Sequence, residues 1–104
     1  MSKVFIAGLL LISNMAMAYS TDTGVVKRVF VNPDGLIAFQ IEGGFTDAIA
    51  DGQCPSNNGW AGHNNADSLL KSAILAAKVG GLSVTVTTQG CEGSWLKIKD
   101  MYVN

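Results

Sequence analysis

Two segments near the start of the mature chain have the hydrophobic patterns of strands, and a turn sequence separates them. Residues 23–31 are rich in β-branched side chains, and residues 36–42 alternate along the chain. The Asn-Pro-Asp-Gly sequence at 32–35 is a strong turn signal, because proline fixes φ and glycine accepts a left-handed conformation. The pattern predicts a β-hairpin with one face toward water. The positions expected to face the core are Ile37, Phe39 and Ile41.

A helical period replaces the alternation in residues 66–79. Asn65 is suited to cap the start of this helix, and Gly80 and Gly81 are suited to end it. The expected core face holds Leu69, Leu70, Ala73, Ile74 and Ala77, and the opposite side holds Lys71, Leu75 and Lys78. This outer side is only half polar. It fits either packing against a neighbouring subunit or a weakly amphipathic exposed helix.

Two further strands are predicted after the helix, at residues 82–88 and 95–103, with a bulge near Asp100. The expected inward positions are Leu82, Val84, Val86, Ile98, Met101 and Val103, and the expected outward ones are Lys97 and Lys99. Residues 43–64 show little pattern, and we expect a loop there with at most a brief strand or turn at 45–50. The order β-β-(loop)-α-β-β indicates a mainly β fold with one helix (α+β), such as a small antiparallel barrel.

The start of the chain has the pattern of a secretory signal peptide. Nine apolar residues at 4–12 follow Lys3, and Ala16 and Ala18 are the small residues of a cleavage site. We expect a signal peptide at residues 1–18, cleaved after Ala18, and a single domain at residues 19–104. The apolar run is shorter than a bilayer span of about 20 residues, so we expect no membrane insertion. The mature protein is expected to be secreted or periplasmic.

Charge excludes one class of partner. Without the leader, six basic residues face eight acidic ones, which gives a net charge of −2. A sequence-independent nucleic-acid binder needs clustered lysine and arginine to displace counterions, and no such cluster is present in the sequence. We therefore expect no nucleic-acid partner.

Cys54 and Cys91 are the two cysteines of the chain. In an exported protein of this size, one disulfide between them is the default expectation. The chain-entropy model assigns about 3–4 kcal/mol to closing a loop of this length. A zinc site is the alternative, but two cysteines and one histidine without CxxC or HxxxH spacing argue against it.

The sequence offers no constellation typical of an enzyme. His63 is the single histidine, no GxSxG elbow is present, and both cysteines are expected to form the disulfide. The acids are scattered, and the glycine pairs are turn and cap signals rather than a phosphate loop. We therefore expect no catalytic residue, no metal and no cofactor. A small hydrolase that uses His63 is the least favoured alternative.

Trp60, His63 and Asn64 lie in a stretch rich in amide side chains. Such a surface suits sugars, because an aromatic ring stacks on a pyranose face and amides bond its hydroxyl groups. The three residues are therefore candidate ligand-binding residues. The alternative is that Trp60 covers the core beside the disulfide, and the need of a small core for a large apolar side chain favours it. Trp95 has the same two alternatives.

These segments together resemble small secreted bacterial proteins similar to the B subunit of subtilase cytotoxin, and more broadly the pentameric B subunits of bacterial toxins. The resemblance covers about residues 24–104. It rests on GVVKRVFVNPDGLIAFQIEG, Cys54, Trp60, ADSLLKSAILAAKVGG, LSVTV, GCEGS and LKIKDMYVN, in that order. It implies an OB-like barrel with a Cys54–Cys91 bridge and a pentamer whose central pore is lined by Lys71, Leu75 and Lys78. It also implies glycan binding on the outer surface.

The function expected from the sequence is that of a secreted or periplasmic, non-enzymatic binding module. It is expected to be a homo-oligomer with a glycan or a partner protein as ligand. The alternative is a periplasmic inhibitor or structural protein-interaction module that does not bind sugar.

Overall fold

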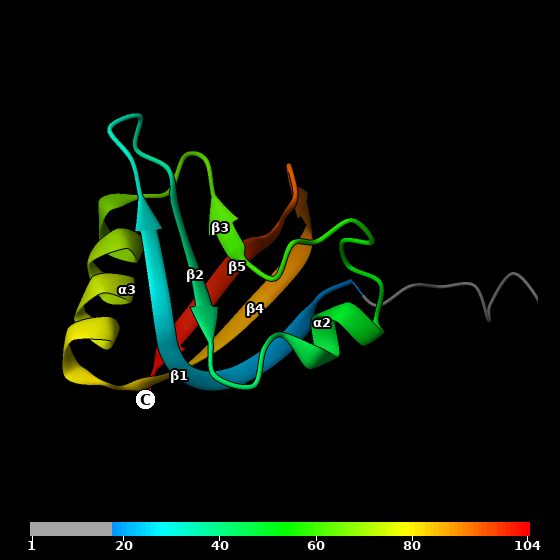
Figure 1. Cartoon of the computed structure of the whole chain (residues 1–104), viewed down its shortest axis with the longest axis horizontal. Helices are drawn as coiled ribbons and strands as arrows, with labels where there is room; N and C mark the ends of the chain where they lie inside the picture. Colours follow the sequence, from blue (N-terminus) through cyan, green and yellow to red (C-terminus); the bar gives the residue numbers. More distant parts are fainter. Residues whose placement is uncertain (1–17) are drawn as a thin grey trace, which may run out of the picture.

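The computed structural model describes residues 18–104 of the chain. The predicted signal peptide falls on residues outside this range, apart from Ala18 at its end. The described part contains five strands and two helices (Figure 1). In chain order these are β1 (Ser20–Val31), β2 (Ile37–Ile41), α2 (Thr46–Ala50), β3 (Ala61–His63), α3 (Ser68–Gly80), β4 (Ser83–Glu92) and β5 (Trp95–Val103).

The five strands pair in a closed ring in the order β1-β2-β3-β5-β4, and β4 pairs back onto β1. Strand β1 has 12 residues and bends around the ring, so its first half pairs with β4 and its second half with β2. Figure 1 shows this bend and places α3 beside the upper half of β1. The predicted first hairpin is confirmed, but its outer face is not fully open to water, because Ala38 on that face is buried.

The core fills the inside of the ring. Its inward positions follow the alternation of the strands, and two residues of α3, Ile74 and Ala77, are fully buried against them. Phe39 and Phe45 meet edge to face with their ring centroids 5.9 Å apart. The buried apolar residues of the strands include Val26, Ile37, Ile41, Val84, Val86, Leu96 and Ile98, and most of these were predicted to be inward.

The prediction of a single helix is wrong, because α2 forms where a strand or turn was expected. This helix has five residues, and Phe45 at its N-cap provides no side-chain hydrogen bond. The buried carboxylate of Asp22 on β1 caps it instead and accepts from the backbone N–H of Asp47 (2.8 Å) and of Ala48 (3.1 Å). A cap that comes from a distant strand leaves no local sequence signal.

Strand β3 also forms within the segment predicted as loop. It has three residues, which is too short for a detectable period. It pairs antiparallel with β2 and parallel with β5, so the sheet is not wholly antiparallel as predicted. Without β3 the ring would be open between β2 and β5.

Helix α3 begins later than predicted, because Asp67 rather than Asn65 is its N-cap. The Asp67 carboxylate accepts from the backbone N–H of Leu69 at 2.9 Å. At its other end Gly81 has φ 64°, the left-handed cap conformation that the sequence predicted. Leu69 was expected in the core but is 76% exposed, since one residue rotates the helix by about 100° from Leu70, which packs on the core.

The β4–β5 hairpin confirms the predicted bulge. Thr87 pairs with Asp100 and Thr88 with Ile98, so Lys99 has no opposite residue on β4. Met101 packs on the core as expected. The inward position expected for Leu82 is wrong, because Leu82 precedes β4 and is 39% exposed. Val103 lies on the expected face, opposite the buried Val84, but it is 42% exposed at the end of β5.

Candidate functional site

Aromatic side chains gather on the outer side of β1, β2, β3 and β5. We define the aromatic face as Arg28 and Phe30 on β1, Gln40 on β2, Trp60 just before β3, and Trp95 at the start of β5. Arg28 and Phe30 are exposed, and the other three are partly buried. Their outward direction follows from strand alternation, because neighbouring residues such as Phe39, Ile41 and Leu96 are buried in the core.

The strand register arranges the aromatic face in two rows. In the first row, Arg28 pairs with Gln40, and its guanidinium carbon lies 5.3 Å from the ring centre of Trp60. In the second row, Phe30 meets Trp95 edge to face with ring centroids 5.9 Å apart. Since Arg28 and Phe30 are two residues apart on one strand, the rows are separated by about 7 Å.

Small residues lie beneath the second row. Phe30 pairs with Ala38, and Ala38 pairs with Gly62. A Cβ atom on Gly62 would lie 2.4 Å from Cε3 of Trp95 and 2.8 Å from Cβ of Ala38, which is too close for either contact. The absence of a side chain at Gly62 therefore lets the indole of Trp95 lie across β3 and reach Phe30.

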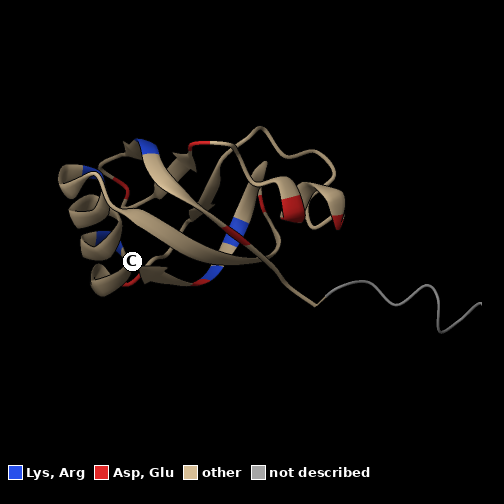
Figure 2. Ribbon diagram, turned by 90° about the horizontal axis from the view of Figure 1, so that it is seen from below, with Lys and Arg blue, Asp and Glu red and all other residues tan. Residues whose placement is uncertain are grey.

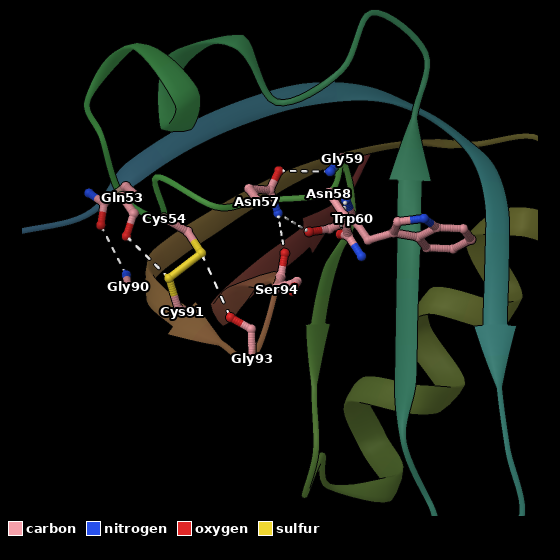
Figure 3. Close-up of a disulfide and its surroundings, with 10 residues drawn as sticks. All are labelled: Gln53, Cys54, Asn57, Asn58, Gly59, Trp60, Gly90, Cys91, Gly93 and Ser94. Atoms are coloured by element: carbon pink, nitrogen blue, oxygen red, sulfur yellow. Dashed lines mark hydrogen bonds between the residues drawn. A yellow bond between two sulfur atoms is a disulfide. The ribbon is translucent and has the colours of Figure 1, made fainter.

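The loop before β3 is attached to the β4–β5 hairpin by the predicted disulfide (Figure 3). The Cα atoms of Cys54 and Cys91 lie 5.1 Å apart. Beside them, Gln53 accepts from the backbone N–H of Gly90 at 3.0 Å and donates to the hydroxyl of Ser20 at 3.1 Å. The disulfide thus belongs to a set of contacts that joins this loop to β4 and to β1.

Asn57 connects the same loop directly to the aromatic face. Its side-chain amide nitrogen donates to the backbone carbonyl of Trp60 and to that of Ser94, both at 2.9 Å. The Trp60 carbonyl also accepts from the backbone N–H of Leu96 on β5 at 2.9 Å. Figure 3 shows the indole of Trp60 pointing away from the disulfide and over the neighbouring strand. Asn57 therefore fixes the backbone from which this indole projects.

Trp60 does not cover the core, so the alternative that the sequence favoured is wrong for this residue. The indole of Trp60 lies on the outer side of the sheet, against Arg28, and Trp60 is not part of the buried core cluster. Phe39 and Phe45 are the large aromatic side chains of that cluster. These two phenylalanines are the large apolar side chains that the small core needs, a role that the sequence had assigned to Trp60.

His63 and Asn64 do not join Trp60. A Cβ atom on Gly62 would point toward the aromatic face, so the side chain of the next residue, His63, points to the other side of the sheet. The Nδ1 of His63 accepts from the backbone N–H of Asn65 at 3.0 Å. The backbone N–H of Asn64 donates to Glu92 at 3.1 Å. The three candidate ligand-binding residues are thus divided between two places.

Arg28, Phe30 and Gln40 were not among the predicted site residues. One signal was present, because Phe30 is a large aromatic residue in a predicted strand; its outward direction became known from the structure. The stacking of the Arg28 guanidinium on the Trp60 indole had no signal in the sequence, since this contact depends on how β3 joins the sheet.

The predicted outer residues of α3 do not all point away from the core. Lys78 donates to the backbone carbonyl of Lys27 at 3.1 Å, and the Lys71 amine lies beside the turn at Gly35. Leu75 is 44% exposed, as expected. The residues furthest from the core carry no charge. We define the outer face of α3 as Leu69, Ser72, Leu75, Ala76 and Val79.

Residues 18–104 bring no three metal-ligating side chains together. Within the same range, each helix is too short or too polar to cross a bilayer. Comparison with models of protein families, with curated proteins and with solved structures finds no match to the chain. A functional assignment therefore rests on the geometry of its own residues.

The contacts of Asn57 give a stability prediction. Asn57→Asp places a carboxylate against the two carbonyl oxygens that now accept from the amide, so we expect a loss of about 1–3 kcal/mol in the free energy of unfolding. Urea denaturation followed by tryptophan fluorescence measures this change. Asn58→Asp is the matched control, because Asn58 uses only its side-chain oxygen, which accepts from the Trp60 N–H. Equal losses in the two variants would contradict the role assigned to Asn57.

Proposed function

We propose that this protein is a non-enzymatic carbohydrate-binding module and that the aromatic face is its binding surface. The observation that carries the proposal is the position of both tryptophans. A small domain normally uses its largest apolar side chains in the core, yet Trp60 and Trp95 lie outside it on one side of the sheet.

The groups around the two indoles suit a sugar. The C–H face of a pyranose packs on an aromatic ring, and the hydroxyl groups at its edge need donors and acceptors. Gln40 provides both, and a guanidinium stacked on an indole, as in Arg28, retains N–H donors along its edge. The ion pairs found among residues 18–104 involve Lys97 and Lys99, so within this range no carboxylate forms an ion pair with Arg28.

The strand order supports an OB-like barrel as the identity of this fold. A five-stranded Greek-key barrel of that class binds oligosaccharides and oligonucleotides on the side formed by its second and third strands. The aromatic face covers that side, and β3, β5 and β4 follow β2 around the ring. This agrees with the proposed relation to toxin B subunits.

Charge distinguishes a glycan from single-stranded nucleic acid, which also stacks on aromatic side chains. Figure 2 shows charged residues spread thinly over the ribbon, without a basic track. Arg28 is the one cation of the aromatic face, whereas nucleic-acid affinity depends on neutralising several phosphates. The glycan is therefore the better ligand.

A protein-interaction module without sugar binding is the second candidate. Tryptophan and arginine are also the residues that dominate protein interfaces, so the aromatic face alone suits both partners. The side-chain amide of Gln40, which pairs with Arg28 in the first row, favours the glycan. A hydrolase with His63 has less support, since this residue lies apart from the aromatic face.

We further propose that the protein is exported and forms homo-oligomers, pentameric as in the toxin B subunits. The disulfide fits an oxidising compartment. The outer face of α3 leaves Leu69 76% and Val79 88% exposed without a charge between them. An uncharged apolar helix face of this kind is typical of a surface covered by another subunit.

Glycan binding is tested by screening the purified protein on a glycan array and titrating the best ligand into variants. Trp60→Ala and Trp95→Ala are each expected to weaken binding about tenfold or more, which corresponds to about 1.4 kcal/mol. Tyr102→Ala is the control, because Tyr102 is 71% exposed but lies outside the aromatic face. An array without hits, or an equal loss in the control, would remove sugar binding and favour a protein partner.

The oligomer is tested by light scattering at micromolar concentration. We expect the wild-type protein to associate and Val79→Glu to be monomeric, because a carboxylate would have to be buried in the contact. Ile49→Glu on α2 is the control, since Ile49 is also exposed (58%) but lies on another helix. A wild-type protein that is monomeric at this concentration would contradict the proposed oligomer.

A further inference from the structure

A groove along β5 contains a second candidate site. It consists of two adjoining cavities of about 540 and 510 Å³ that share His63, Ile98 and Lys99. No residue of the aromatic face lines either cavity. Both volumes lie in the range of small-molecule sites.

The first cavity is cationic. Lys97, Lys99 and His63 line it together with Gln89, Gly90, Cys91 and Ile98, and none of these carries a carboxylate. Lys97 lies 4.0 Å from Glu92, and Lys99 lies 3.4 Å from Asp100, with both lysine side chains about half exposed. Exposed ion pairs of this kind contribute little to stability, so an anionic ligand can replace them.

His63 adds a donor to this cavity. Its Nδ1 accepts from the backbone N–H of Asn65, so a neutral ring carries its proton on Nε2. The lysines and His63 thus provide hydrogen-bond donors for an anion.

The second cavity is mainly apolar. Its walls are Ala66 just before α3, Leu69, Leu70 and Ala73 from the first half of α3, and Ile98 and Met101 from β5. Two carboxylates also line it, those of Asp67 and Asp100. They disfavour an anion in this cavity and therefore orient a ligand with its anionic group toward the first one.

The shape of the groove indicates the kind of occupant. Strand β5 pairs with β4 along most of its length, but β3 covers its other edge only at Leu96 and Lys97. The groove follows the next residues, from Ile98 to Met101, and joins one cationic cavity to one mainly apolar cavity. This division of charge within a short distance favours a compact amphiphilic small molecule.

We propose that the groove along β5 binds a small amphiphile with one anionic group. The anionic group contacts His63, Lys97 and Lys99, and the apolar part packs on Leu70, Ala73 and Met101. This site is independent of the aromatic face and of its glycan.

The test is a calorimetric titration of the oxidised protein with dodecanoate and, separately, with dodecanol, both below the concentration at which they aggregate. We expect dodecanoate to bind at least tenfold more tightly than dodecanol. Lys99→Met and Lys97→Met should each weaken dodecanoate binding several-fold and leave dodecanol unchanged. Lys71→Met is the matched control, because Lys71 lies beside the β1–β2 turn and lines neither cavity; it should leave both affinities unchanged.

Ala73→Phe tests the apolar cavity, since the larger ring fills it. Binding of both probes should be lost while thermal unfolding shows that the variant is folded; if it is not folded, the lysine variants decide. Three results would overturn the proposal: no dodecanoate binding, equal affinity for the two probes, or an equal loss in Lys71→Met. Trp60→Ala should bind dodecanoate normally, and a loss there would place the amphiphile on the aromatic face instead.

Discussion

The disulfide between Cys54 and Cys91 and the amide of Asn57 join the loop before β3 to the β4–β5 hairpin. Strand β3 has three residues and only two register pairs with β5. Ordering the irregular loop that leads to it costs conformational entropy that so short a strand recovers poorly. A covalent link and two side-chain hydrogen bonds at the end of the loop lower that cost. These contacts therefore favour closure of the ring.

The same attachment builds the aromatic face. The backbone carbonyl of Trp60 is held by Asn57 and by Leu96 of β5, so its indole lies over β2 and against Arg28. Parallel pairing of β3 with β5 also brings Gly62 beneath Trp95. A structural feature that closes the ring therefore also creates the surface that we propose for ligand binding. The groove along β5 lies outside this surface and uses the bulged part of the last hairpin.

Local patterns in the sequence predicted the elements that local interactions form. The hairpin around residues 32–35 and the C-terminal end of α3 follow from turn chemistry and glycine caps. The disulfide followed from having two cysteines in a chain whose first residues predict an export signal. Helix α2 and strand β3 could not be predicted, because Asp22 and β5 stabilise them from distant parts of the chain. The side on which Trp60 lies depends on the same long-range register, so the core and the surface remained alternatives until the register was known.

The most direct test of the account is a nitrogen–proton correlation spectrum of the two indole N–H groups, recorded before and after reduction of the disulfide. The account predicts that reduction shifts and broadens the resonance of Trp60 and also moves that of Trp95, since both depend on the attached loop. Thiol titration verifies that Cys54 and Cys91 are reduced. Two indole resonances that stay unchanged in the fully reduced protein would contradict the claim that this attachment holds the aromatic face in place.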